Sequence, residues 1–205
     1  MIEKMIVNIN EEFQRYEKLI EKIKEYDINS ERLKIDVSAV YYYKYDLFYS
    51  IESLKHINHI YIKLKNKYDR ITQGFIIHER KTGTECHKIL FDTIKINVKR
   101  YAIIIKYFGD PDDLDFFNEI GNALFMRDGL EFSLIELEND YDLQDLKFKI
   151  TVLDTVLKTK FTEKIERIVE CCPSFETSYY PENFWWRHPS KILAEKQARV
   201  KQQSE

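Results

Sequence analysis

Glycine and proline are scarce in this chain, and their scarcity limits what it can fold into. Its 205 residues include five glycines and four prolines, whereas sandwiches and barrels need such residues at many turns. Long, uninterrupted elements are therefore expected, and these are usually helices. A composition of 44% hydrophobic and 33% charged residues is typical of a folded globular protein and too apolar for intrinsic disorder. We predict a mainly α fold, a bundle of five or six helices.

Helical spacing recurs along the sequence. Between residues 10 and 26, Phe13, Tyr16, Ile20 and Ile23 are separated by three or four positions, which indicates an amphipathic helix. Comparable patterns predict further helices over residues 38–68 (one helix or two), 90–108, 111 to about 129, and 146–171. The connection at residues 131–145 is acidic and partly alternating, so one short β-hairpin remains an open alternative there.

Prolines and glycines predict where the helices stop. The clearest boundary is Gly109-Asp110-Pro111, a stop, an N-cap and a first-turn proline in succession. Three further prolines between residues 173 and 189 exclude a continuous helix, so we expect residues 174–189 to be extended and Ser190 to cap a short basic helix. We therefore divide the chain into a helical domain, residues 1–172, and an aromatic segment with a short basic helix, residues 173–205.

Cysteine usage and the N-terminal sequence indicate a cytoplasmic protein. Three cysteines, two of them adjacent, do not make the disulfide framework of a secreted domain. The first residues lack the pattern of a signal peptide, and the apolar cluster at residues 101–108 is far shorter than the ~20 residues of a membrane span. The chain has no Gly-rich phosphate loop, HExxH or paired CxxC motif, so we expect neither a cofactor nor a metal.

Charge is distributed unevenly along the chain. Residues 110–145 carry twelve acidic side chains against a single Arg127, while residues 55–106 have a large basic excess. Such segregated charges steer partners toward a surface. Within the basic region, cations alternate with tyrosines, as on surfaces that hold phosphates and stack bases. The candidate nucleic-acid-binding residues are Lys63, Lys65, Lys67, Arg70 and Lys81. A sequence pI near 6.0 favours the competing interpretation, a solvated helix face.

The C-terminal segment concentrates aromatic side chains, including both tryptophans. Aromatic residues together with arginine dominate binding hot spots, and an extended, proline-spaced peptide can lie in a groove on a partner. The candidate partner-binding residues are Tyr179, Tyr180, Phe184, Trp185, Trp186 and Arg187. The competing interpretation is that the segment folds back over the protein's own core, because so many exposed aromatic residues would promote aggregation.

The sequence RKTGTECH separates Arg80 from His87 by six residues. This spacing resembles the Arg-(four to six residues)-His motif of HEPN-fold ribonucleases, which are helical domains that usually work as dimers. The resemblance implies that Arg80 would steady the scissile phosphate and that His87 would assist attack by the 2′-hydroxyl. A histidine suits such acid-base chemistry because its ordinary pKa lies near ~6.5.

The leading functional prediction is a non-catalytic accessory or adaptor protein. It would dock a protein partner, or a second copy of itself, through its charged faces and its aromatic C-terminal segment. A HEPN-like ribonuclease that uses Arg80 and His87 is the first alternative. A nucleic-acid-binding protein that uses the basic residues between Lys63 and Arg100 is the second.

Overall fold

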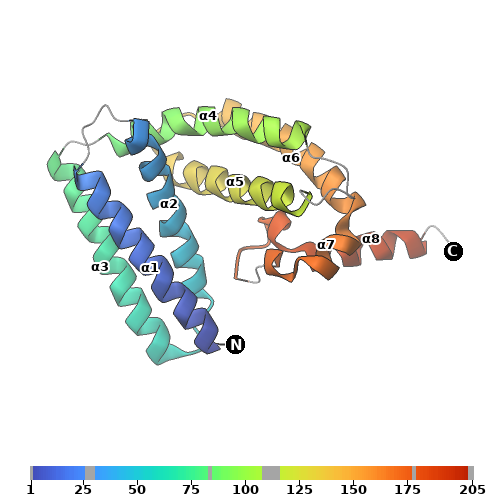
Figure 1. The fold of residues 1–205 in the computed structure, drawn as a ribbon, viewed down its shortest axis with the longest axis horizontal. Coiled ribbons are helices and arrows are strands. Elements are labelled where there is room, and N and C mark those ends of the chain that lie inside the picture. Colours follow the sequence, from blue (N-terminus) through green and yellow to red (C-terminus); the bar gives the residue numbers. More distant parts are fainter. Residues whose placement is uncertain (1, 26–30, 83–84, 108–115, 177–178, 203–205) are drawn as a thin grey trace. The chain divides into compact units, whose positions relative to one another are not determined.

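The computed structural model describes residues 2–25, 31–82, 85–107, 116–176 and 179–202. These residues form eight α-helices and two 3₁₀ turns and contain no strand, so the mainly α prediction is confirmed (Figure 1). The helices are α1 (Ile2–Glu25), α2 (Glu31–Glu52), α3 (Asn58–Thr82), α4 (Cys86–Lys106), α5 (Phe116–Leu137), α6 (Gln144–Glu163), α7 (Ile165–Cys171) and α8 (Pro189–Gln202). The 3₁₀ turns are η1 (Pro173–Phe175) and η2 (Trp185–Arg187).

Helix α5 is longer than the sequence predicts. The expected end near Gly129 is wrong, because α5 continues through this glycine to Leu137. Leu130, Leu134 and Leu137 follow at helical spacing and are all buried. Their burial outweighs the ~1 kcal/mol by which glycine disfavours a helix interior. The predicted boundary at Gly109-Asp110-Pro111 lies outside the described residues.

Other predicted elements are divided or reshaped. Residues 38–68 belong to two helices, α2 and α3, which is one of the two predicted outcomes. Residues 146–171 form α6 and α7, with the break at Lys164, instead of one helix. The described part of residues 174–189 is not simply extended as predicted, because η1 and η2 fold parts of it into tight turns.

The chain divides into two compact units. Unit 1 comprises residues 1–96 and 128–143, and unit 2 comprises residues 97–127 and 144–205. Helices α4 and α5 each contribute to both units, and residues 173–205 group with unit 2. Among the described residues, no helix has the combined length and hydrophobicity of a membrane span.

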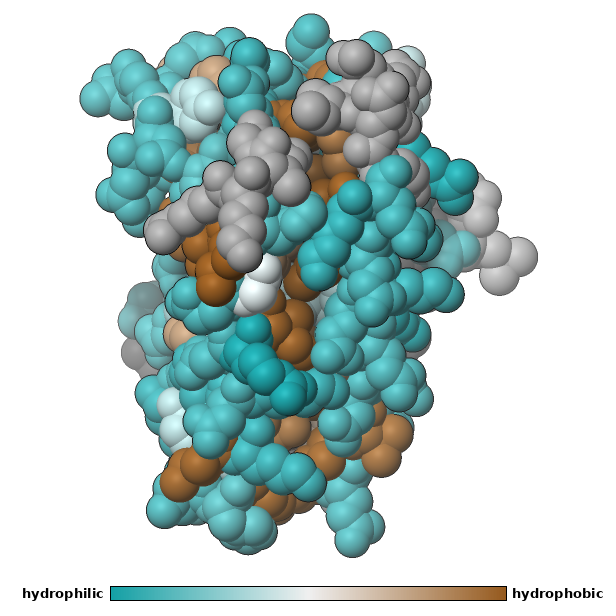
Figure 2. Space-filling view, turned by 90° about the vertical axis from the view of Figure 1, so that its left-hand side faces the viewer, coloured by the Kyte–Doolittle hydropathy of each residue, from teal (hydrophilic) through white to brown (hydrophobic). Residues whose placement is uncertain are grey.

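In unit 1, helices α1, α2 and α3 pack against one another (Figure 1). The amphipathic pattern of α1 turns Phe13, Tyr16 and Ile20 inward, where they are buried. Tyr41 of α2 and Phe75 of α3 meet edge to face, with ring centroids 6.1 Å apart. Figure 2 shows a face that is mainly hydrophilic, with hydrophobic atoms visible between the polar side chains. On the face in view, polar side chains thus cover most of the apolar ones.

In unit 2, helix α8 packs against α6 and α7. Leu157 and Phe161 of α6 are fully buried, and so are Ile165 and Ile168 of α7. The C-terminal segment adds Trp186 to this core, with 1% of its surface exposed. Unit 2 therefore needs the segment that follows Pro173 to complete its interior.

Candidate functional sites

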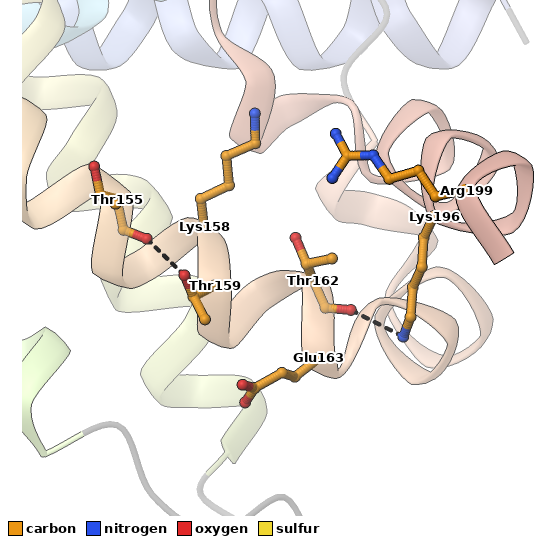
Figure 3. A pocket seen from close by; sticks show the side chains of 7 residues that line it. All are labelled: Thr155, Lys158, Thr159, Thr162, Glu163, Lys196 and Arg199. Carbon is orange, nitrogen blue, oxygen red and sulfur yellow. Dashed lines mark hydrogen bonds between the residues drawn. The ribbon is translucent and has the colours of Figure 1, made fainter. Parts of the chain in front are cut away.

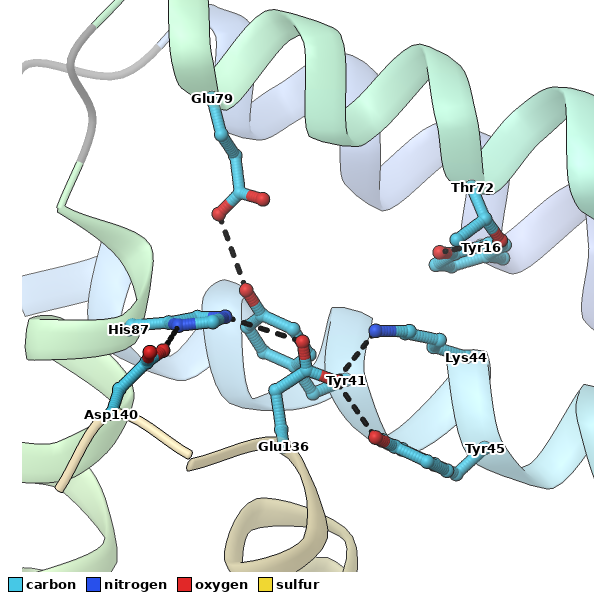
Figure 4. Close-up of polar contacts among 9 residues, drawn as sticks. All are labelled: Tyr16, Tyr41, Lys44, Tyr45, Thr72, Glu79, His87, Glu136 and Asp140. Carbon is cyan, nitrogen blue, oxygen red and sulfur yellow. Dashed lines mark hydrogen bonds and ion pairs between the residues drawn. The ribbon is translucent and has the colours of Figure 1, made fainter. Parts of the chain in front are cut away.

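A largely covered carboxylate, Glu136, organises a polar network in unit 1 (Figure 4). From α2, the Lys44 ammonium lies 2.5 Å from Glu136 Oε2 and the Tyr45 hydroxyl donates to the same oxygen at 2.8 Å. From the first turn of α4, His87 Nε2 lies 3.2 Å from Glu136 Oε1. His87 Nδ1 lies 2.5 Å from Asp140 Oδ2. We call these five residues the Glu136 network.

The carboxylates of this network favour the imidazolium form of His87 at neutral pH. Its hydrogen bond to Glu136 raises the pKa of His87 from 6.5 to about 9, aided by Asp140 and opposed by partial burial. The positive end of the α4 helix dipole disfavours a cation at this position. The two carboxylates outweigh this effect, because the pKa of His87 is raised despite it. Burial alone would raise the pKa of Glu136, but hydrogen bonds from His87, Lys44 and Tyr45 and the charge of Lys44 lower it to about 2.

This geometry bears directly on the ribonuclease alternative. A general base needs a free lone pair near neutral pH, whereas both nitrogens of His87 face carboxylate oxygens. The Arg80 side chain lies outside the described residues. The ribonuclease interpretation remains a prediction, and it is checked by incubating labelled RNA with wild-type protein and with the Arg80→Ala, His87→Ala double variant. We expect cleavage by neither protein.

The Glu136 network should make the stability of unit 1 depend on pH. A cationic His87 stabilises the fold fully below its unfolded pKa of 6.5, and this contribution disappears as the pH rises through about 9. We therefore expect the free energy of unfolding to fall over that interval, as measured by urea denaturation. In Glu136→Gln, the His87 pKa measured by NMR should drop toward its ordinary value. An unchanged His87 titration in that variant would contradict the network.

Two other chemical groups of unit 1 are held in neutral form near the network. The Tyr41 hydroxyl donates to Glu79 Oε1 at 3.2 Å (Figure 4), and burial followed by the charge of Glu79 raises the pKa of Tyr41. The Cys86 side chain is buried, and burial also raises the pKa of its thiol. Nucleophilic cysteines have lowered pKa values instead, so Cys86 is a structural residue.

A second carboxylate pair joins α1 to α2 in unit 1. Glu12 is hydrogen-bonded to the buried Asp46, and Glu12 Oε2 is buried with no hydrogen-bond partner among the described residues. Burial, followed by the charge of Asp46, raises the pKa of Glu12 to about 8. Two adjacent carboxylates cannot readily both ionise, so the pair shares a proton at neutral pH.

The Glu12–Asp46 pair predicts a stabilising substitution. The unfolded chain releases the Glu12 proton near pH 4.5 but the folded chain holds it to about 8, so folding stability falls as the pH rises between these values. Glu12→Gln retains a hydrogen-bond donor toward Asp46 and removes the titration. We expect a higher urea midpoint at pH 8 and a flatter pH dependence than in wild type. A lower midpoint for Glu12→Gln at pH 8, with the pH dependence of wild type retained, would contradict the shared proton.

Two of the predicted nucleic-acid residues of α3, Lys65 and Lys67, have partners within the protein. Lys65 pairs with Asp69 at 2.5 Å, and Lys67 lies over the Phe13 ring at 4.3 Å and 3.8 Å from Glu17. Lys63 and Arg70 are exposed, and the Lys81 side chain is outside the described residues. The groove beside Arg70 is lined by residues of both charges: Glu17, Lys18, Glu21 and Lys24.

The predicted partner-binding aromatic residues are divided by their burial. Tyr180, Phe184 and Trp186 are buried in unit 2, and each ring contacts the next at a tilt, with centroids 5.2 Å and 5.1 Å apart. Tyr179, Trp185 and Arg187 are half-buried. The first three therefore belong to the protein's own core, which leaves only the second three for contact with a partner.

A buried ion pair fixes this aromatic segment to α5 and α6 within unit 2. The Arg127 Nε lies 2.9 Å from both carboxylate oxygens of Asp154, and the Tyr101 hydroxyl donates to Asp154 Oδ1 at 2.8 Å. The Arg127 guanidinium also lies 4.1 Å from the centre of a Trp186 ring. One charged side chain thus links the helices of unit 2 to the C-terminal segment.

Helices α6 and α8 border an open groove in unit 2, of about 630 Å³ (Figure 3). We call it the α6–α8 groove. Lys158, Lys196 and Arg199 line it together with Thr155, Thr159, Thr162 and Glu163. Lys196 is held by the Thr162 carbonyl at 3.1 Å and by Glu166 at 3.0 Å. Lys158 and Arg199 are exposed, so the groove offers two accessible cations against one carboxylate.

Beside this groove, α6 turns an uncharged strip toward solvent. Phe148, Val152 and Val156 are 69%, 49% and 44% exposed and recur every fourth residue, on the side opposite the buried Ile150 and Leu157. Three threonines adjoin them. We call the six residues the α6 outward face: Phe148, Thr151, Val152, Thr155, Val156 and Thr159. The threonine hydroxyls donate to carbonyls one turn back at 2.8–3.0 Å, so they are not free to donate to a ligand.

Comparison with known protein families, curated proteins and solved structures found no match to this chain. Among the described residues, no group of three or more histidine, cysteine, aspartate or glutamate side chains could hold a metal ion. The candidate sites are therefore the Glu136 network, the α6–α8 groove and the α6 outward face, each defined by the chain's own geometry.

Proposed function

We propose that this protein is a non-catalytic accessory or adaptor protein that docks a protein partner on unit 2. The observation that carries the proposal is the α6 outward face, where three apolar side chains are exposed in line on one helix. Single exposed apolar residues are ordinary, whereas several gathered on one helix face and bordered by polar residues support an interaction surface. Its helical spacing suits a partner helix laid along α6.

The row alone is too small to hold a partner. Because between about a third and somewhat over half of each of these three residues is already covered, burying the rest contributes roughly 2–5 kcal/mol. Association costs about 4–15 kcal/mol in lost translational and rotational freedom. Residues beside the row must therefore contribute, and the α6–α8 groove is the adjoining feature because Thr155 and Thr159 belong to both.

The aromatic C-terminal segment has a supporting role in this proposal. Trp185 meets Phe161 edge to face at 6.1 Å, and Lys158 lies 5.5 Å from the centre of a Trp185 ring. The half-buried Trp185 thereby positions one cation at the groove. The docking prediction for this segment is thus narrowed to Tyr179, Trp185 and Arg187 at its surface.

The test compares two exposed apolar positions in different units. The wild-type protein and a Phe148→Asp, Val152→Asp double variant are tagged and recovered from native cells together with the proteins bound to them. We expect the double variant to lack a bound protein that wild type carries. Ile35→Asp alters a residue of α2 in unit 1 that is 64% exposed, and it should retain that protein. Circular dichroism checks that all three remain helical. Retention of the same proteins by wild type and both variants would contradict docking on α6.

A further inference from the structure

We infer that the partner element is an acidic amphipathic helix. Its apolar side would cover the α6 outward face, and its carboxylates would enter the α6–α8 groove. The inference rests on the proposed docking function and adds the chemistry of the partner to it. It draws on three observations of unit 2: the charge of the groove, the closed backbone of α6 and the internal bonding of its threonines.

The charge of the groove selects an acidic partner. Lys158 and Arg199 are exposed cations on opposite walls, one from α6 and one from α8. In the view of Figure 3, the charged ends of both side chains lie toward the upper part of the groove. Glu163 is the one carboxylate among the residues that line it, and Lys196 is already held by Glu166. Charged groups that are complementary in this way give specificity and faster association.

The backbone of α6 selects a helix over an extended strand. Strand addition requires a sheet edge with free N–H and C=O groups, and the described residues contain no strand. The interior of α6 satisfies its backbone groups within the helix. The outward face from Phe148 to Thr159 spans about 17 Å, or three turns. A helix with apolar residues at the same spacing can follow it along that length.

The threonines argue against nucleic acid as the ligand of this surface. Phosphate binding draws on hydroxyl and backbone donors as well as cations, but Thr151, Thr155 and Thr159 already donate to carbonyls of α6. Their hydroxyl donors are therefore not available to phosphate groups. A carboxylate-bearing helix uses both the apolar row and the cations, whereas a polyanion would leave the row exposed.

The experiment titrates the full-length protein with three labelled amphipathic peptides about twenty residues long. All three carry the same leucine row, and their flanks carry glutamate, glutamine or lysine. At low salt we expect the glutamate peptide to bind about tenfold more tightly than the glutamine peptide, as two rim ion pairs allow. The difference should shrink at high salt. The Lys158→Glu, Arg199→Glu double variant should prefer the lysine peptide.

The outcomes separate the inference from the docking function. If the glutamate and glutamine peptides bound with equal affinity, and Phe148→Asp weakened the binding of both, the partner would not need to be acidic. Docking on α6 would still stand. Absence of binding by all three peptides, with helicity unchanged, would overturn both. Single-stranded RNA is added as a competitor. If the RNA displaced the glutamate peptide and bound Phe148→Asp as tightly as wild type, the groove would be a nucleic-acid site and the inference would be overturned. Ile35→Asp, which lies in unit 1, should leave all three affinities unchanged.

Discussion

Replacing Trp186 with alanine should lower the stability of unit 2 by about 3–5 kcal/mol, the usual effect of truncating a large buried aromatic residue. Only 1% of the Trp186 surface is exposed. Its ring contacts Phe184 at 5.1 Å and Trp185 at 5.7 Å between centroids, and it also faces the Arg127 cation. The substitution would leave a cavity and remove the cation–π contact together.

Urea denaturation followed by far-ultraviolet circular dichroism measures this effect. The neighbouring Trp185→Ala provides the matched control, because Trp185 is half-buried and should lose less stability. Equal urea midpoints for wild type and Trp186→Ala would mean that the segment is not part of the core. If the loss is as expected, deleting residues 173–205 cannot test docking, since the deletion would unfold unit 2 itself.

Removing the carboxylate of Asp154 should be comparably damaging. In Asp154→Ala the Arg127 guanidinium, with 8% of its side chain exposed, would lose the Asp154 carboxylate as an ion-pair partner. The Tyr101 hydroxyl would lose its acceptor as well. Breaking one side of a buried ion pair costs about 3–5 kcal/mol. Thermal and urea unfolding of the variant measure that loss.

A double variant separates the effect of the Arg127 charge from the effect of the lost contact with Asp154. Arg127→Met combined with Asp154→Leu removes both charges and keeps similar volume. Replacement of a buried pair by apolar residues is often neutral, so we expect the double variant to be more stable than Asp154→Ala. If the double variant were the less stable of the two, the pair itself would stabilise unit 2 beyond what apolar packing offers.

The fold class could be predicted because it follows from local signals. Few breakers and a persistent three-to-four spacing favour helices wherever they occur, and the structure has helices there. Helix ends were harder, as Gly129 shows. A glycine is a weak stop signal, and whether a helix passes through it depends on the packing of Leu130 and Leu134, which is a tertiary effect.

The candidate sites were predictable in part. His87 was singled out from its neighbours in sequence, but its carboxylate partners Glu136 and Asp140 lie 49 and 53 positions away, beyond any local pattern. The aromatic segment was recognised, but its docking on a partner and its burial in the protein's own core both stayed open, because exposed and buried aromatic clusters have the same composition. The α6 outward face had a visible signal: Phe148, Val152 and Val156 repeat every fourth residue, out of phase with the buried row.

The location of the tryptophans gives the protein two optical readouts. The chain has two tryptophans and 14 tyrosines, and Trp185 and Trp186 both belong to unit 2. Tryptophan fluorescence therefore reports the unfolding of unit 2 alone. Circular dichroism near 222 nm reports the helices of both units. Coincident curves from the two probes would indicate one cooperative transition. Separated curves would give the stability of each unit from a single titration, with no label and no engineered residue.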